Sequence, residues 1–148
     1  MTESTRHRRW PAYLMAVLLL GYAVGKAVFA MRSRPGFPSG PPAEGHSFVL
    51  STVTTQWLAA ATATIGAGLC VVSAMEVGLK APRRLMLPAL VLLTLSVGAG
   101  AAIVVIDGFI GLGLGWHWYH GAVGLVAIGL ITAMFRSYLT ATRRYVVR

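Results

Sequence analysis

The residues of this chain that could do chemistry are a few polar side chains in or beside long apolar stretches. An ionisable side chain within an apolar helix is costly unless it is paired or hydrated, so it is a functional candidate. Lys26 and Asp107 are the charged candidates, and we expect them to form an ion pair. The polar pocket predicted around this pair consists of Tyr22, Lys26, Gln56, Asp107, His117 and His120. Such a pocket would bind an anionic or quinone-like headgroup through the Lys26 ammonium.

A metal site is an alternative use of the same residues. His117 and His120 can present two imidazoles on one face of a helix, and Asp107 or His46 could add a third ligand. The chain has no pair of cysteines and no His-Glu-x-x-His motif that would strengthen this prediction. Haem is disfavoured, because no histidine lies well inside an apolar stretch to serve as an axial ligand. We therefore predict no cofactor and no catalytic residue.

A purely structural role also accounts for these polar residues, and we favour it over the pocket and the metal site. Lys26 has a long aliphatic stem that lets its ammonium reach the headgroup region of a bilayer. Asp107 can be a solvated helix end, and the aromatic residues Trp116, Trp118 and Tyr119 suit the belt at a membrane surface. The residue types alone leave the pocket, the metal site and the structural role open.

Four long apolar stretches must position these side chains. Hydrophobic residues make up 56% of the 148 and charged residues 11%, whereas soluble domains carry about 25% charged residues. This apolar surface exceeds what a core of this size can hide, so lipid must cover much of it. We predict an all-α fold, an antiparallel bundle of four transmembrane helices at residues 10–31, 48–75, 85–106 and 116–135.

Basic residues are sorted to one side of these four spans. Ten of the thirteen Lys and Arg residues lie at the N-terminus, between the second and third spans or at the C-terminus; the exceptions are Lys26, Arg32 and Arg34. Because cytoplasmic segments carry an excess of positive charge, both termini are predicted to be cytoplasmic, in a plasma (cell inner) membrane protein. The same rule explains the net charge of +9, so we expect lipid rather than nucleic acid as the partner of these charges.

The spans are predicted to form a single membrane domain, residues 10–136. A cytoplasmic tail of residues 1–9 precedes this domain, and a basic cytoplasmic tail of residues 137–148 follows it. Prolines and glycines fill the predicted outer loop from Arg32 to Ser47, and a basic inner connection runs from Glu76 to Arg84. A signal peptide cleaved near Ala30 is the alternative for the first span, but its apolar stretch exceeds the usual length of about 7–15 residues.

Small residues recur at helical spacing within the spans. Lipid-embedded helices associate through close packing, which small side chains permit. We expect the packing positions to be Gly21, Gly25, Ala63, Gly66, Gly100, Gly121 and Gly124. The Gly21-x-x-x-Gly25 pair is alternatively a face for self-association. Cys70 is the single cysteine, so it cannot form a disulfide within the chain, and we interpret it as a packing residue.

Four segments form a recognisable pattern along the chain: residues 21–26, GYAVGK; residues 34–41, RPGFPSGP; residues 107–109, DGF; and residues 116–121, WHWYHG. This pattern resembles one found in small four-span membrane proteins of actinobacteria. The resemblance implies the four-span architecture and brings no known function. Two other four-span groups fit poorly, because multidrug exporters carry an acidic residue deep in the first span and disulfide-forming enzymes need more than one cysteine.

Three functions are consistent with these features. The leading prediction is a non-enzymatic accessory or structural subunit that contacts another membrane protein or a second copy of itself. The second is a small-molecule binder or transporter component that uses the polar pocket near the outer leaflet. The third is a membrane enzyme or metal site at the outer ends of the third and fourth spans.

Overall fold

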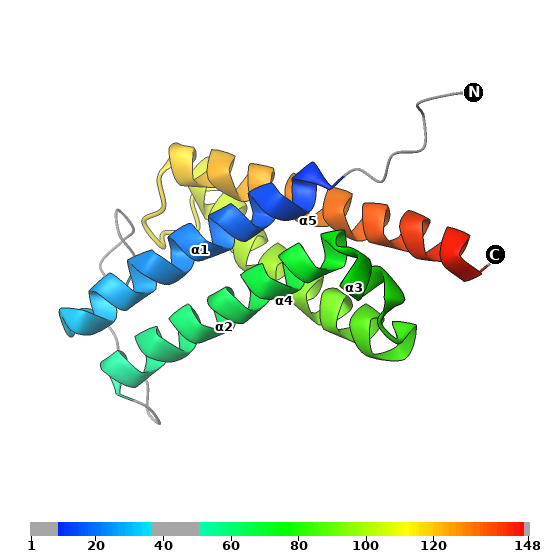
Figure 1. Cartoon of the computed structure of the whole chain (residues 1–148). Coiled ribbons are helices and arrows are strands. Elements are labelled where there is room, and N and C mark those ends of the chain that lie inside the picture. The colour runs from blue at the N-terminus through cyan, green and yellow to red at the C-terminus, as the bar shows by residue number, and fades with distance from the viewer. Residues whose placement is uncertain (1–8, 37–50, 147–148) are drawn as a thin grey trace.

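The computed structural model describes residues 9–36 and 51–146, and these residues form helices without a strand. The helices are α1 (Trp10–Met31), α2 (Thr52–Ala74), α3 (Glu76–Lys80), α4 (Arg83–Ile110) and α5 (Trp118–Val146) (Figure 1). Four of them are long and apolar enough to cross a membrane, namely α1, α2, α4 and the Trp118–Thr142 part of α5. The fold is therefore all-helical, with the four candidate membrane spans that the sequence predicted.

The helix ends differ from the predicted spans where local structure extends a helix. The predicted first span, 10–31, coincides with α1, and α2 begins after Ser51, whose Oγ accepts a hydrogen bond from the Thr54 amide. Residues 48–50 of the second predicted span lie outside the described residues. The third span continues past Asp107 to Ile110, because the helix ends only at Gly111, whose φ of 81° suits a left-handed cap.

The last helix is longer than the predicted fourth span, and the inner connection contains a helix that was not predicted. α5 begins two residues later than the predicted fourth span and continues to Val146, so residues 137–146 extend a helix instead of forming a separate tail. The predicted 76–84 connection contains the short helix α3. Its Glu76 and Lys80 side chains lie one turn apart and form an exposed ion pair, with Nζ 3.3 Å from Oε2.

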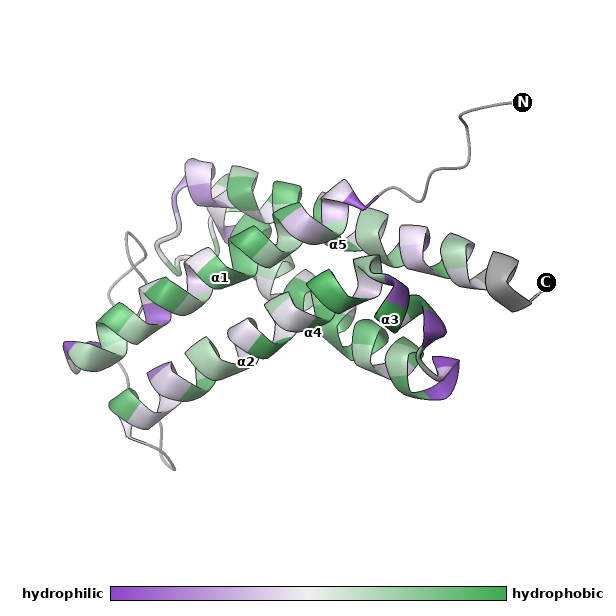
Figure 2. Ribbon diagram, in the orientation of Figure 1, coloured by the Kyte–Doolittle hydropathy of each residue, from purple (hydrophilic) through white to green (hydrophobic). Residues whose placement is uncertain are grey.

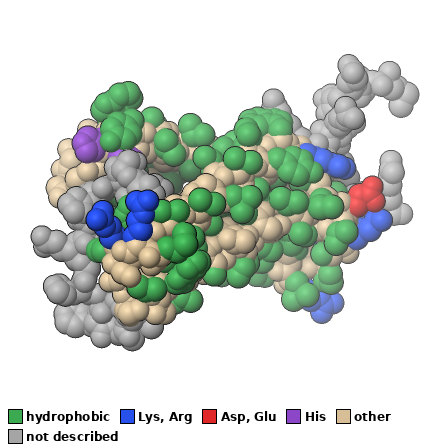
Figure 3. All heavy atoms as spheres, turned by 60° about the vertical axis from the view of Figure 1, so that its left-hand side comes forward, with side chains coloured by type: hydrophobic (Ala, Val, Ile, Leu, Met, Phe, Trp, Pro, Cys, Tyr) green, Lys and Arg blue, Asp and Glu red, His purple; other side chains and the backbone are tan. Residues whose placement is uncertain are grey.

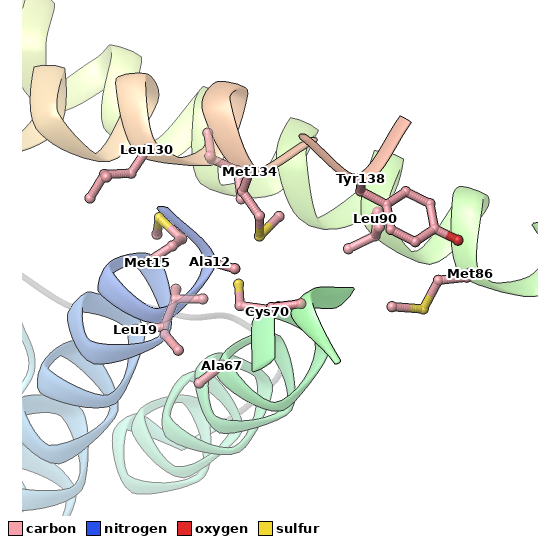
Figure 4. Close-up of a cluster of buried hydrophobic side chains, with 13 residues drawn as sticks. Ala12, Met15, Leu19, Ala67, Cys70, Met86, Leu90, Leu130, Met134 and Tyr138 are labelled. Atoms are coloured by element: carbon pink, nitrogen blue, oxygen red, sulfur yellow. The ribbon is translucent and has the colours of Figure 1, made fainter. Parts of the chain in front are cut away.

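The long helices associate in two pairs. α1 packs along α2, which we call the first pair, and α4 packs along α5, which we call the second pair; α1 is also in contact with α5 (Figure 1). The shared core joins the early turns of α1 and α4 to the late turns of α2 and α5 (Figure 4). Cys70 and Leu90 are fully buried there, beside Met15, Met134 and Tyr138. Cys70 is thus a packing residue at the junction of the two pairs.

Glycines set a close approach between the two helices of the second pair. A Cβ added to Gly121 would lie 2.8 Å from the Phe109 ring, and one added to Gly124 would lie 2.8 Å from Val105 Cγ2. Gly108 was not among the predicted packing residues, but it faces Gly121. A Cβ added to Gly108 would lie 3.1 Å from the Cα of Gly121. Real Cβ atoms essentially never approach to 2.8 Å, and 3.1 Å at Gly108 is tighter than most Cβ contacts, so the close packing of α4 on α5 relies on glycine at these positions.

Of the other predicted packing residues, some are buried against a neighbouring helix and some lie on the open surface. Gly66 and Ala63 are buried, and a Cβ on Gly66 would lie 2.9 Å from Leu93 of α4. Gly25 is half-buried. Gly21 and Gly100 are exposed, and a Cβ on either would meet nothing within 4 Å, so the prediction that they face the interior of the chain does not hold. Equal spacing therefore does not distinguish a packed glycine from a surface glycine.

The surface has charged ends and an apolar middle. Figure 3 shows Lys and Arg side chains toward the two ends of the visible face, with hydrophobic side chains between them, and Figure 2 shows the same division along the ribbons. Exposed side chains in the middle include Val17, Leu58, Ile65, Leu92 and Leu95. An apolar surface this extensive favours contact with lipid over water.

Candidate functional site

Asp107 lies at the end of α4 and organises the turn that leads to α5. Its side chain is 3% exposed. Oδ1 accepts hydrogen bonds from the Leu112 amide at 2.6 Å and the Leu114 amide at 3.0 Å, and Oδ2 accepts one from the Trp116 amide at 2.7 Å. Hydrogen bonds to an ionised carboxylate are stronger than neutral ones. Asp107 is thus the acceptor around which residues 111–117 fold back.

The glycines of this turn make its path possible. Gly111, Gly113 and Gly115 have φ values of 81°, 81° and 85°, in the left-handed region that side chains with a Cβ rarely adopt. Their alternation with Leu112 and Leu114 turns the amides of every second residue, Leu112, Leu114 and Trp116, toward the same carboxylate. The glycine-rich segment that the sequence analysis interpreted as a plain connection is therefore a backbone nest for the Asp107 carboxylate.

Lys26 and Gln56 lie on the first pair and meet at one backbone oxygen. The Gly36 carbonyl accepts hydrogen bonds from Lys26 Nζ at 2.9 Å and from Gln56 Nε2 at 3.0 Å. Gln56 Nε2 also lies 3.4 Å from the Arg34 carbonyl oxygen. Gln56 is only 5% exposed although it is in the second turn of α2. The two side chains tie the segment after α1 to the start of α2.

The aromatic ring of Tyr22 lies beside the Lys26 ammonium. Nζ is 5.5 Å from the centre of the ring, within the range of a cation–π contact. The two residues are one turn apart on α1, so the helix itself sets this contact. Tyr22, Lys26 and Gln56 therefore form one polar group on the first pair.

The predicted ion pair between Lys26 and Asp107 is not formed. The Asp107 carboxylate accepts from backbone amides of its own turn, and the Lys26 ammonium donates to the Gly36 carbonyl. Each charged side chain bonds to backbone groups that lie within ten residues of it in the sequence. These bonds form without bringing α1 and α4 together. The six residues predicted as one pocket thus belong to two groups, one on each helix pair.

The two histidines follow the Asp107 turn at the start of α5, and we call Asp107, His117 and His120 the Asp107 group. His120 is buried, and its Nδ1 accepts a hydrogen bond from the His117 backbone amide at 3.3 Å. The two ring centres are 5.9 Å apart with a 48° tilt, and His117 stacks on Tyr119. Within residues 9–36 and 51–146, no three His, Cys, Asp or Glu side chains are placed to hold a metal ion. His46 lies outside the described residues.

Aromatic side chains surround His120 at the start of α5. Trp116 contacts His120 edge-on at 5.0 Å between ring centres, and Tyr119 lies at 4.2 Å. Trp118 and Tyr119 are exposed, together with Phe109 and other apolar residues of the turn. Amphipathic rings at a helix end that faces a bilayer surface favour the headgroup region. This geometry favours the structural interpretation of the Asp107 group.

Two buried polar atoms have no hydrogen-bond partner in the part of the chain that the structure describes. They are Gln56 Oε1 and the Tyr138 hydroxyl. Tyr138 was not among the predicted site residues, because it falls in the segment that was predicted to be a cytoplasmic tail. The sequence analysis also could not select the Gly36 carbonyl, since every residue carries one. An unsatisfied buried acceptor is rare, so Gln56 Oε1 calls for an explanation.

Comparisons with models of protein families, with curated proteins and with solved structures find no match for this chain.

Proposed function

We propose that this chain is a multi-pass protein of the plasma membrane, an antiparallel four-span bundle with both termini in the cytoplasm. It acts as a non-enzymatic accessory or structural subunit. The sorting of basic residues supports the orientation, because ten of thirteen Lys and Arg residues flank the ends that would be cytoplasmic. The Asp107 carboxylate and the Lys26 ammonium are occupied by backbone partners, which favours a structural role over catalysis.

The observation that carries the subunit proposal is the bare surface of α4. Only 6% of the most apolar stretch of α4 is buried, compared with 28–39% in the other three spans. α4 packs along α5 and touches α2 in few places, for example where Leu93 meets Gly66. Most of the circumference of this span therefore remains available to another helix or to lipid.

Small residues on the exposed side of α4 favour a helix as its neighbour. Ser96, Ala99 and Gly100 are exposed near the middle of the span, and Leu92 and Ile103 lie above and below them on the same side. Small residues let two backbones approach closely, and a serine hydroxyl can bond across a helix contact. A lipid-facing surface gains nothing from this arrangement. The partner is another membrane protein or a second copy of this chain.

Photo-crosslinking from α4 tests this proposal. A photoreactive amino acid at position 96 should yield one defined protein adduct in native membranes, and the same residue at Val17 on α1 should yield mainly lipid adducts. Gly100→Ile should abolish the protein adduct, because its side chain fills the proposed contact, whereas a Cβ at this position meets nothing within 4 Å in the chain itself. Lipid adducts alone at position 96, or an adduct unchanged in Gly100→Ile, would contradict the subunit proposal.

The orientation is tested by labelling single cysteines in a Cys70→Ala background. A cysteine at Arg34 should react with an impermeant maleimide added outside intact cells. A cysteine at Lys80 should react only after the membrane is permeabilised. Reaction in the opposite order would invert the proposed topology.

A further inference from the structure

Three basic residues do not follow the charge sorting of the rest of the chain. Lys26, Arg32 and Arg34 lie in or just after α1, at the end that the proposed topology places outside. The described residues of the first pair carry no acid at this end, and Glu44 lies outside the described residues. These three residues are therefore exceptions to the rule that orients the spans, at a surface where anionic headgroups attract basic side chains.

The hydrogen bonds of Lys26 and Gln56 define a position for an oxygen atom. Donors from two different helices, Lys26 Nζ and Gln56 Nε2, converge on the Gly36 carbonyl oxygen at 2.9 Å and 3.0 Å. An anionic oxygen accepts hydrogen bonds more strongly than a carbonyl does. Arg34 to Gly36 lie beyond the end of α1 and outside any helix, so exchanging the carbonyl for a ligand oxygen breaks no helical hydrogen bond.

Gln56 supplies the second requirement on the ligand. Its Nε2 is fixed by the two carbonyls it contacts, so its Oε1 must be the unpartnered atom. Gln56 is 95% buried, since its exposed fraction is 5%, and an unpaired buried acceptor is unfavourable. The missing partner is an O–H or N–H donor close to the anionic oxygen. The site therefore selects a ligand that joins an anion to a hydrogen-bond donor.

We propose that Lys26, Gln56, Arg32 and Arg34 bind the headgroup of an anionic phospholipid with a free hydroxyl, of the phosphatidylglycerol class. A phosphate oxygen takes the position of the Gly36 carbonyl oxygen between Lys26 and Gln56. A glycerol hydroxyl donates to Gln56 Oε1, and the two arginines lie near the phosphate. Lys26 is about 7 Å inside the end of α1, at 1.5 Å per residue, which is a depth that headgroups reach.

Only the assignment to the outer leaflet rests on the proposed function. The lipid site itself is on the first pair, whereas the partner surface is on α4. Lipid binding by the detergent-solubilised protein does not depend on orientation or on a partner. Failure of the lipid experiment would therefore leave the photo-crosslinking result unaffected, and the reverse also holds.

Native mass spectrometry of the full chain with three lipids of equal acyl chains tests the site. Phosphatidylglycerol carries the charge and the hydroxyl, phosphatidylmethanol carries only the charge, and phosphatidylcholine has no net charge and no donor. Retention should decrease in that order. Lys26→Met should reduce phosphatidylglycerol retention about fivefold, as expected for one cation at a lipid surface, and the control Lys80→Met at the opposite end should not.

Two further variants separate the hydroxyl contact from the charge. Gln56→Leu should make phosphatidylglycerol and phosphatidylmethanol bind equally. The double variant Arg32→Gln and Arg34→Gln changes only exposed side chains, so it should fold normally and still lose preference for anionic lipid. Equal retention of phosphatidylglycerol and phosphatidylcholine by the wild type would overturn the proposal. If an equal concentration of free glycerol phosphate displaces the lipid, the site recognises a soluble phosphate compound, and the proposal of a phospholipid ligand is wrong.

Discussion

The two helix pairs differ in how completely the hydrogen bonds of their predicted site residues are satisfied. On the second pair, the Asp107 carboxylate is saturated by three amides of the adjoining turn. On the first pair, Lys26 and Gln56 share one carbonyl, and Gln56 Oε1 stays without a partner among the described residues. A polar group inside a membrane protein thus indicates a ligand only when its hydrogen bonds remain incomplete.

The same contrast holds for backbone packing. Gly121 lies where a Cβ would be 2.8 Å from the Phe109 ring, whereas Gly21 on α1 has nothing within 4 Å of its hypothetical Cβ. Within the second pair, α4 and α5 are therefore held together by close glycine contacts and by the Asp107 turn, although the remaining circumference of α4 stays exposed. On the first pair, Gly21 lies on open surface, and the hydrogen bonds of Gln56 remain incomplete.

The largest expected effect comes from removing the Asp107 carboxylate. Asp107→Ala should lower the free energy of unfolding in detergent by about 3 kcal/mol, because three amides lose a charged acceptor and are partly rehydrated. Asp107→Asn is the matched variant, since its single carbonyl oxygen can still accept from Leu112 and Leu114, and it should lose less. Chemical denaturation followed by circular dichroism measures both. Equal stability of Asp107→Ala and the wild type would remove the contrast between the pairs.

A smaller effect is expected when a methyl group is added at equivalent glycines of the two pairs. Gly121→Ala should cost about 1–3 kcal/mol, because α4 and α5 must separate to admit the Cβ. Gly21→Ala should change stability by less than about 0.5 kcal/mol, since its Cβ projects into open surface. The same denaturation measurement compares the two variants. A loss at Gly21 equal to that at Gly121 would show that α1 also has a packed partner at this position.

The effect of replacing Gln56 on stability is expected to be smaller than the effects at Asp107 and Gly121. Gln56→Leu should cost about 1 kcal/mol or less, because the lost bonds to the Arg34 and Gly36 carbonyls are offset by removal of an unpaired acceptor. Gln56→Glu keeps the shape but places a carboxylate against those carbonyls, so it should cost more than the leucine variant. If Gln56→Leu proves as damaging as Asp107→Ala, Gln56 is a structural anchor and its free acceptor needs no ligand.

The approximate location of all four spans could be predicted from the sequence, but not their ends. Trp10 to Met31 is one uninterrupted apolar stretch, and its predicted ends coincide with α1. The end of α4 was predicted too early, because Asp107 resembles a solvated terminus until the amides of residues 112–116 are seen to satisfy it. The end of α5 was also predicted too early, because Arg136 suggests a membrane surface, whereas hydrogen bonding continues the helix to Val146.

The sequence by itself determined that this chain forms four apolar helices, because length and hydropathy act locally and are set by residue type. Only the tertiary structure decided which glycines are packed, and that Asp107 and Lys26 bind separate backbone groups instead of each other. The physical reason is that the partners are backbone carbonyls and amides, which every residue carries. Their availability depends on where the chain turns and on which helix lies alongside, and no pattern of residue types encodes that directly.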